Sequence, residues 1–199
     1  MRRAIVTVVA VLALAGCEAA PTAAQTTAQT QPADTVRLAV EPGGRFVVLA
    51  GPISRHAAPF LGVASTNFYL LRSFIDTRSG QTAHQLYVED SYPGAERHWD
   101  AARLATGEPL RFIPISKNEI TCELGCSYAE EFAAALPEPL LRASPQGFTV
   151  LFTAHSGTQK AITVPPDLVA KQLAAIDQAR ATRPLTVTPG PNPAPPPPR

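Results

Sequence analysis

The chain has 199 residues, 45% hydrophobic and 17% charged, and its 17 basic and 16 acidic residues leave a formal net charge of +1. No block of like charge breaks this balance. Nucleic acids and anionic lipid surfaces attract proteins through clustered basic residues, so the composition argues against either as an electrostatic partner.

The first seventeen residues have the pattern of a bacterial export signal. Arg2 and Arg3 give a positive start, residues 4–15 are uncharged and almost wholly apolar, and Leu-Ala-Gly-Cys closes the segment at Cys17. A positive region, a short apolar region and a small-residue cleavage site define a secretory signal. The apolar run is too short for a transmembrane helix, which needs roughly 20 residues. The closing four residues resemble a lipobox, which implies cleavage before Cys17 and acylation of its thiol.

Acylation at Cys17 would make membrane lipid the first expected partner of this protein. Several acyl chains hold a protein stably at a bilayer, so we expect a lipid anchor in the cell envelope, facing the periplasm. Glu18 follows the cysteine. In proteins with this signal an Asp at that position is the usual inner-membrane retention cue, and its absence favours the outer membrane. Loss of residues 1–16 removes two arginines and leaves 15 basic against 16 acidic residues, a net charge of −1.

Two polar stretches flank a central segment. Residues 17–34 carry no large apolar side chain after the cysteine, so they cannot bury enough surface to offset the entropy of ordering, and we expect a flexible tether. Residues 181–199 hold 8 of the 21 prolines and are expected to form a disordered, Pro-rich tail of polyproline II character. A docking peptide or spacer is the alternative for this tail. Residues 35–180 have the usual size of one domain with one core.

The first half of the central segment shows the period-two alternation of strands. Residues 36–40 and 45–49 flank a Pro-Gly-Gly turn and predict a hairpin. A long β-prone run at 67–75 precedes a turn ending at Gly80, where positive φ is needed, and a returning strand at 81–89. These segments predict a second hairpin.

The middle of the segment is less regular. Residues 97–104, which contain the only tryptophan, fit a strand or a short helix, and residues 110–115 alternate as a strand. Residues 127–136 combine apolar side chains four apart, which suits a helix, with flanks that suit a strand. One helical turn is expected near Pro137, because proline is favoured at the start of a helix.

The last part of the segment predicts a third hairpin and one helix. Residues 147–152 and 160–164 flank a Ser-Gly-Thr turn, and Asp167 is the predicted N-cap of the C-terminal helix. Three hairpins without alternating helices predict a mainly β protein. We expect an antiparallel β-sandwich, immunoglobulin-like or similar, with one C-terminal α-helix.

Cys122 and Cys126 are the only cysteines besides Cys17. In an exported protein, two cysteines this close predict a structural disulfide, and Gly125 would ease the tight ring. Thiolate metal binding and redox activity remain as alternatives. Three residues separate the pair, whereas a thioredoxin-type motif has two, and no His follows Cys126 as in a haem c attachment site.

The order of segments between residues 115 and 176 resembles the invasion-associated locus B family. The residues that carry this likeness are Thr121-Cys122-Glu123-Leu124-Gly125-Cys126, Leu140-Leu141-Arg142-Ala143, Gly147-Phe148-Thr149-Val150-Leu151-Phe152, Gly157 and Ile162-Thr163-Val164-Pro165. The resemblance implies an exported periplasmic β-sandwich without known catalysis, and it supplies no catalytic residue. The whole chain also resembles alphaproteobacterial lipoproteins, a likeness that implies no function.

The sequence predicts no metal, cofactor or catalytic site. A zinc site could form only if the second hairpin packed on the tryptophan segment and brought together His84, His98, Glu89 and Asp90. The favoured interpretation is that these four residues are exposed polar side chains on an outer strand face. Ser156 follows a histidine but lacks the Gly-x-Ser-x-Gly elbow and is expected in a hairpin turn.

Neighbouring carboxylates do not predict glycoside hydrolysis. The pairs Glu89–Asp90 and Glu130–Glu131 are adjacent in sequence, and adjacent residues on a strand point to opposite faces. An acid and a nucleophile must instead face each other across a cleft.

Tyr87, Tyr92, Arg97 and Trp99 form the candidate binding surface. Aromatic and arginine side chains are typical of binding hot spots, and core packing is the alternative for this cluster. The sequence favours a non-enzymatic, lipid-anchored envelope protein that acts as a binding or adaptor module in the periplasm, with an envelope protein as its partner. The alternative is a periplasmic metal-handling or thiol-redox protein that uses Cys122 and Cys126.

Overall fold

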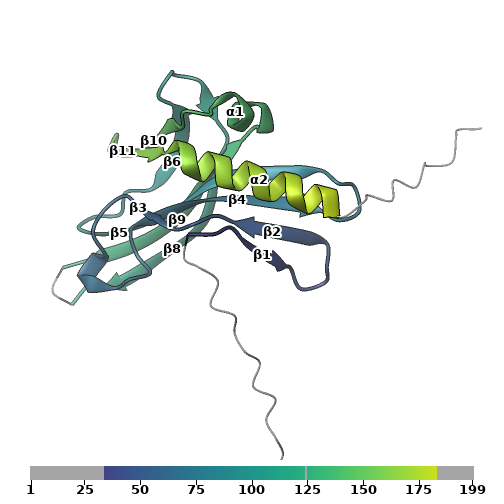
Figure 1. Cartoon of the computed structure of the whole chain (residues 1–199). Helices are drawn as coiled ribbons and strands as arrows, with labels where there is room; N and C mark the ends of the chain where they lie inside the picture. Colours follow the sequence, from purple (N-terminus) through teal and green to yellow (C-terminus); the bar gives the residue numbers. More distant parts are fainter. Residues whose placement is uncertain (1–33, 124, 183–199) are drawn as a thin grey trace, which may run out of the picture. The chain divides into compact units, whose positions relative to one another are not determined.

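The computed structural model describes residues 34–123 and 125–182 (Figure 1). The predicted export signal, the acylation site Cys17, the predicted tether up to residue 33 and residues 183–199 of the predicted tail lie outside them. The described part is mainly β, and its strands form two antiparallel sheets. In this part of the chain, no helix has the length and apolar character needed to cross a bilayer.

The larger sheet has the strand order β1-β2-β4-β5-β9-β8, with the short β3 beside β4. Its strands are β1 (Arg37–Val40), β2 (Phe46–Ala50), β3 (Ser54–Arg55), β4 (Phe68–Asp76), β5 (Thr82–Pro93), β8 (Phe112–Thr121) and β9 (Ser127–Leu136). The smaller sheet has the order β11-β10-β6-β7. Its strands are β6 (Trp99–Leu104), β7 (Pro109–Leu110), β10 (Phe148–Ala154) and β11 (Gln159–Val164).

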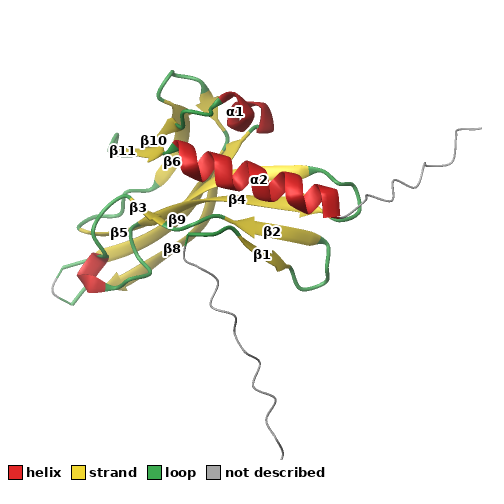
Figure 2. Cartoon of the chain, viewed as in Figure 1, coloured by secondary structure: helices red, strands yellow, loops and turns green. Residues whose placement is uncertain are grey.

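Three short or terminal helical segments complete the fold: the 3-10 turn η1 (Phe60–Gly62), α1 (Glu138–Ala143) and α2 (Pro166–Thr182). Figure 2 shows α2 in red lying across the larger sheet near β4. The predicted N-cap is wrong: α2 begins at Pro166, and Asp167 lies inside its first turn, where a carboxylate still favours the positive end of the helix dipole.

The three predicted hairpins are confirmed. Strands β1 and β2, β4 and β5, and β10 and β11 each pair antiparallel. The tryptophan segment, which fitted a strand or a helix, is strand β6. The ambiguous segment 127–136 is strand β9, because it lies between β5 and β8 and alternate side chains such as Phe132 and Leu136 enter the core.

The two sheets share one apolar core. Phe132 lies at its centre, with ring centroids 4.9 Å from Phe152 and 5.4 Å from Trp99. A second cluster lies under α2, where Ile176 packs on Val47 of β2. The predicted sandwich is therefore confirmed, whereas its immunoglobulin-like variant is not.

The predicted disulfide is also confirmed. Cys122 and Cys126 are bonded to each other in the turn between β8 and β9. Gly125 in this turn has φ +114°, a backbone conformation that favours glycine. The bond therefore closes a tight turn at the end of a hairpin.

Candidate functional site

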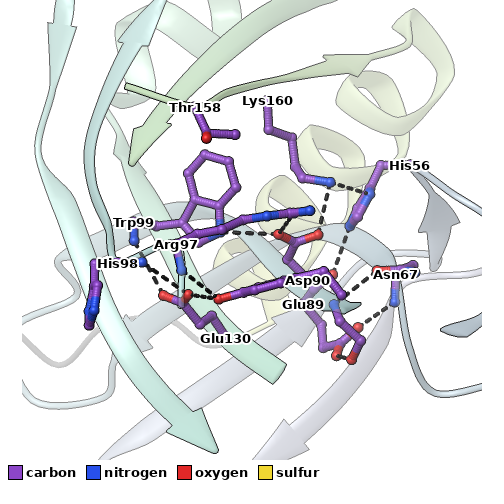
Figure 3. A network of polar contacts seen from close by, with 12 residues as sticks. His56, Asn67, Glu89, Asp90, Arg97, His98, Trp99, Glu130, Thr158 and Lys160 are labelled. Carbon is purple, nitrogen blue, oxygen red and sulfur yellow. Dashed lines mark hydrogen bonds and ion pairs between the residues drawn. The ribbon is translucent and has the colours of Figure 1, made fainter. Parts of the chain in front are cut away.

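A buried carboxylate lies at the junction of the two sheets. Asp90 on β5 is 1% exposed. One carboxylate oxygen accepts hydrogen bonds from Arg97 Nη1 at 2.8 Å and from Trp99 Nε1 at 3.0 Å, and the other pairs with Lys160 Nζ at 2.8 Å (Figure 3). A buried charge is tolerated only when it is paired in this way. Asp90 thus links β5 to β6 and β11.

His56 connects this network to the loop that precedes β4. Lys160 Nζ donates to His56 Nδ1 at 3.1 Å, so the imidazole is neutral there and its Nε2 donates to the backbone carbonyl of Glu89 at 2.7 Å. Burial lowers the pKa of His56 and the nearby Lys160 ammonium lowers it further, although the Glu89 carbonyl opposes this. The ring therefore acts as a neutral link between two strands and the loop.

Two more buried carboxylates lie next to Asp90. Glu89 accepts hydrogen bonds from Asn67 N and Ser91 Oγ, and burial raises its pKa. Glu130 on β9 accepts from the Tyr92 hydroxyl and from the backbone N–H of residues 98 and 99 at 3.2 and 3.3 Å. Protein donors therefore occupy both oxygens of each of these carboxylates.

The register of β5 and β9 places acidic residues opposite one another. Asp90 faces Glu130, and Glu89 faces Glu131. Successive side chains alternate between faces of a sheet, so each pair lies on one face and the two pairs lie on opposite faces. Adjacency along the chain does not reveal these cross-strand pairs, because they arise only from the pairing of β5 with β9.

A cleft of about 530 Å³ opens beside Glu130, between β6 and β8. Three aromatic residues line it: Trp99, Phe112 and Phe132, with the ring centroid of Phe132 5.4 Å from Trp99 and 5.8 Å from Phe112. Ser116 also lines it, and within the described residues its buried Oγ has no hydrogen-bond partner. The floor of the cleft is thus apolar, and its accessible polar groups lie at the rim.

The rim of the cleft is polar and exposed. His98 has φ +54° and pairs with Glu96 at 2.9 Å, and its ring points away from the buried carboxylates (Figure 3). Lys117 binds the same Glu96 at 2.6 Å. Across the opening, His155 lies 3.5 Å from Asp100, and its side chain is 86% exposed. These groups are accessible to a partner that covers the opening.

The structure brings together three of the four residues of the candidate binding surface. The Arg97 guanidinium lies 3.9 Å from the Tyr92 ring centroid and 5.9 Å from that of Trp99. Tyr87 lies on the opposite face of β5, under the Arg72 guanidinium at 4.5 Å. Tyr92 and Trp99 are 2% and 5% exposed, so of the three grouped side chains only Arg97 offers substantial surface to a partner.

The four residues weighed as zinc ligands do not come together. His84, Glu89 and Asp90 are buried, so their expected place on an exposed outer face is wrong; each has a polar partner inside the fold. Across residues 34–123 and 125–182, no group of His, Cys, Asp and Glu is arranged to hold a metal ion. Ser156 lies in the β10–β11 turn, as predicted, where its Oγ is 3.0 Å from Thr158 Oγ1.

A second polar chain, of Ser73, His84 and Glu138, contains the residue types of a hydrolase triad. Ser73 Oγ is 2.8 Å from His84 Nδ1, and His84 Nε2 is 3.5 Å from Glu138 Oε2. Ser73 is fully buried and also accepts a hydrogen bond from Gln172 Nε2 of α2 at 2.8 Å. A substrate cannot reach the Ser73 hydroxyl, so this series of hydrogen bonds attaches α1 and α2 to the larger sheet.

Stability should fall as the pH drops below about 6.5, the ordinary pKa of histidine. Burial lowers the pKa of His84 in the folded state, although Glu138 opposes the shift, while Arg180 and Arg142 add to it. The unfolded chain then takes up a proton first, so the stability present above pH 6.5 is lost progressively as the pH falls from 6.5 toward the lowered pKa of the folded state. Urea unfolding between about pH 8 and pH 5.5 measures this slope.

Glutamine at position 84 should flatten the pH profile. His84→Gln removes the titrating group, and His155→Gln, at a side chain that is 86% exposed, is the matched control. Equal slopes for the native chain and His84→Gln would contradict the assignment. His56 contributes with the same sign, so a residual slope is expected in the variant.

The junction of the sheets places an enclosed acidic network beside an open cleft. Both oxygens of Asp90 and of Glu130 are engaged by protein donors, whereas the adjoining cleft is open and has an aromatic floor. Comparison with protein families, curated proteins and solved structures finds no match to this chain.

Proposed function

We propose that this chain is a non-enzymatic, lipid-anchored protein of the cell envelope, whose β-sandwich is a binding module held by Cys17 at the periplasmic side of a membrane. The cleft between β6 and β8 carries the proposal. Its volume of about 530 Å³ lies within the range of roughly 300–1,000 Å³ typical of ligand sites. Its exposed polar rim, which includes Lys117 and His155, and the partly buried Phe112 of its floor are the groups that a partner could contact.

Two further observations support binding rather than catalysis. The Asp90 carboxylate is paired with Arg97 and Lys160 and accepts a hydrogen bond from Trp99, so its charge is already satisfied while it holds one lining residue of the cleft in place. The polar chain through Ser73 is closed to solvent. An enzyme needs a group that is both reactive and accessible to substrate.

A thiol-redox or metal-handling role is the weaker proposal. Cys122 and Cys126 are bonded to each other, and neither lines the cleft. Their turn is exposed, so a reductant can reach it. The bond closes a hairpin turn, which is a sufficient structural reason for the pair.

Removal of the acylated thiol should release the protein from the membrane fraction. The variant is Cys17→Ser, with residues 1–16 replaced by an export signal that lacks a lipobox, so that an uncleaved signal cannot act as the anchor. Without acyl chains the anchoring energy of roughly 0.8 kcal/mol per buried methylene is lost. Fractionation of cells followed by immunoblotting measures the result. Cys122→Ser/Cys126→Ser with the native signal is the control and should stay with the membrane; retention of both would contradict the anchor.

A photoreactive residue at the rim of the cleft should capture one envelope protein in intact cells. Position 155 is chosen because its side chain is 86% exposed and lines the opening. Position 78, exposed in the β4–β5 turn, is the matched control. Mass spectrometry of the crosslinked product should find one stoichiometric partner from position 155 alone. The same products from both positions, or none from position 155, would count against the cleft as the adaptor site.

A further inference from the structure

One loop exposes large apolar side chains to solvent. The apolar loop, residues 57–64 between β3 and β4, contains no charged residue. Leu61 and Val63 at its tip are 76% and 50% exposed, and Ile53 near its base is 49% exposed. A group of large apolar side chains exposed together marks an interaction site, whereas single ones are ordinary.

The apolar loop is held in one shape from its base. The Arg55 guanidinium donates to the carbonyls of Thr66 at 2.8 Å and Ala64 at 2.7 Å, and Asn67 Nδ2 donates to that of Ala58 at 2.9 Å. These bonds fix both ends of the loop against β3 and β4. The exposure of Leu61 and Val63 is therefore imposed by the fold.

The backbone at the tip satisfies much of its own hydrogen bonding. Gly62 N donates to the Pro59 carbonyl at 3.3 Å and Val63 N to that of Phe60 at 2.9 Å. Thr66 Oγ1 accepts from Phe60 N at 2.8 Å and donates to the Val63 carbonyl at 2.7 Å. A protein interface normally supplies a polar rim and hydrogen bonds, whereas backbone that enters hydrocarbon must be satisfied internally.

The backbone of Leu61 has a conformation that is unfavourable for leucine. Its φ of +49° lies in the left-handed region, which suits Gly, Asn or Asp and is costly for leucine. No burial compensates, because the side chain is 76% exposed. An outlier of this kind points to a function for the side chain.

We propose that the apolar loop dips into the outer surface of the lipid bilayer, placing Leu61 and Val63 among the acyl chains. The inference rests on the proposed lipid anchor, which brings the domain to a membrane. The tether predicted from the sequence has sixteen residues between Cys17 and Asp34, and a flexible chain of that length would span about 20 Å and keep the domain within reach of the bilayer. The loop then sets the orientation of the cleft relative to the membrane.

A tryptophan at the tip tests the contact directly. The acylated mature chain carrying Val63→Trp is reconstituted in phosphatidylethanolamine–phosphatidylglycerol vesicles, with and without lipids brominated on the acyl chains. We expect a blue shift and strong quenching of the added emission. Leu38→Trp, at an exposed position of edge strand β1, is the matched control and should remain unquenched. Trp99 is 5% exposed and gives a constant background.

The outcomes separate the loop from the anchor. If the protein floats with the vesicles and Val63→Trp is no more quenched than Leu38→Trp, the loop inference is overturned and the anchor stands. If the protein does not float, the anchor fails. If the Val63→Trp emission shifts to the blue only after a protein is added, and not with vesicles alone, the lipid assignment is also overturned.

A charge at the tip should weaken vesicle binding without unfolding the chain. In the unacylated mature chain, Leu61→Asp should lower partitioning into the same vesicles by about tenfold or more, the equivalent of burying one leucine. Asp suits the left-handed backbone, so the melting temperature should be unchanged or higher. Leu38→Asp should leave partitioning unchanged. An equal loss in both variants, or none in Leu61→Asp, would overturn the proposal.

Discussion

Replacement of Asp90 by alanine should lower the free energy of unfolding by about 3 kcal/mol, at the lower end of the cost of breaking a buried ion pair. The change leaves Arg97, Lys160 and the Trp99 indole N–H without their shared acceptor. The two cationic side chains are 29% and 18% exposed, so water can partly hydrate them, which keeps the loss near the lower limit. Urea unfolding followed by Trp99 fluorescence and circular dichroism measures the change.

Asp100→Ala is the matched control for this substitution. Asp100 lies on strand β6 of the smaller sheet, its side chain is 51% exposed and its ion pair is a 3.5 Å contact with His155. A surface pair of this kind contributes little, so the loss should stay below about 0.5 kcal/mol. Equal losses at positions 90 and 100 would show that the buried network does not hold the sheets together.

Loss of Asp90 should also loosen the loop before β4. Lys160 is held between Asp90 and His56, and His56 is bonded to the Glu89 carbonyl, so removing the carboxylate frees the ammonium that fixes the imidazole. Local opening of this kind precedes global unfolding in weakly held segments. Hydrogen exchange should therefore rise first in residues 51–67.

The hairpins were predictable because their signals are local. Alternation and a glycine turn identify the strands on both sides of Gly80, and these signals lie within about ten residues of one another. Segment 127–136 carries no comparable signal, because the spacing of its apolar side chains fits both a helix and a strand. Its place between β5 and β8, which tertiary pairing decides, makes it a strand.

The site was less predictable because it depends on register between distant strands. Asp90 and Glu130 are forty positions apart and meet only through the pairing of β5 with β9. The burial of Asp90 depends on Lys160, which is farther still along the chain. Carboxylates without visible partners are normally exposed, so the sequence favoured the wrong surface for this residue.

The separation of Tyr87 from Tyr92 depends on the full length of β5. Tyr87 and Tyr92 are five positions apart, and an odd separation on one regular strand places two side chains on opposite faces. The Pro-Gly after Tyr92 suggested that the strand ended earlier, whereas β5 continues to Pro93. With the full strand in view, parity alone separates Tyr87 from the cluster of Tyr92, Arg97 and Trp99.

Truncation of Phe132 should cost about 3–5 kcal/mol, the range for removing a phenylalanine from a packed core. The residue is 1% exposed, and its ring centroid lies 4.9 Å from Phe152 and 5.4 Å from Trp99. Chemical unfolding measures the loss, and Trp99 emission should shift to the red as its packing partner disappears. Phe132→Leu keeps most of the volume and should cost less than about 1.5 kcal/mol.

The position of Phe132 decides where in this range Phe132→Ala falls. The ring also forms part of the floor of the cleft, so the space left by truncation can open to solvent and fill with water instead of remaining an empty cavity. We therefore expect a loss near the lower limit. Phe74→Ala, on the half-buried outer face of β4 under Arg72, should cost about 1 kcal/mol. If Phe132→Ala costs no more than Phe74→Ala, the floor of the cleft is not the centre of the core, and the cleft is a surface hollow that can be altered without loss of the fold.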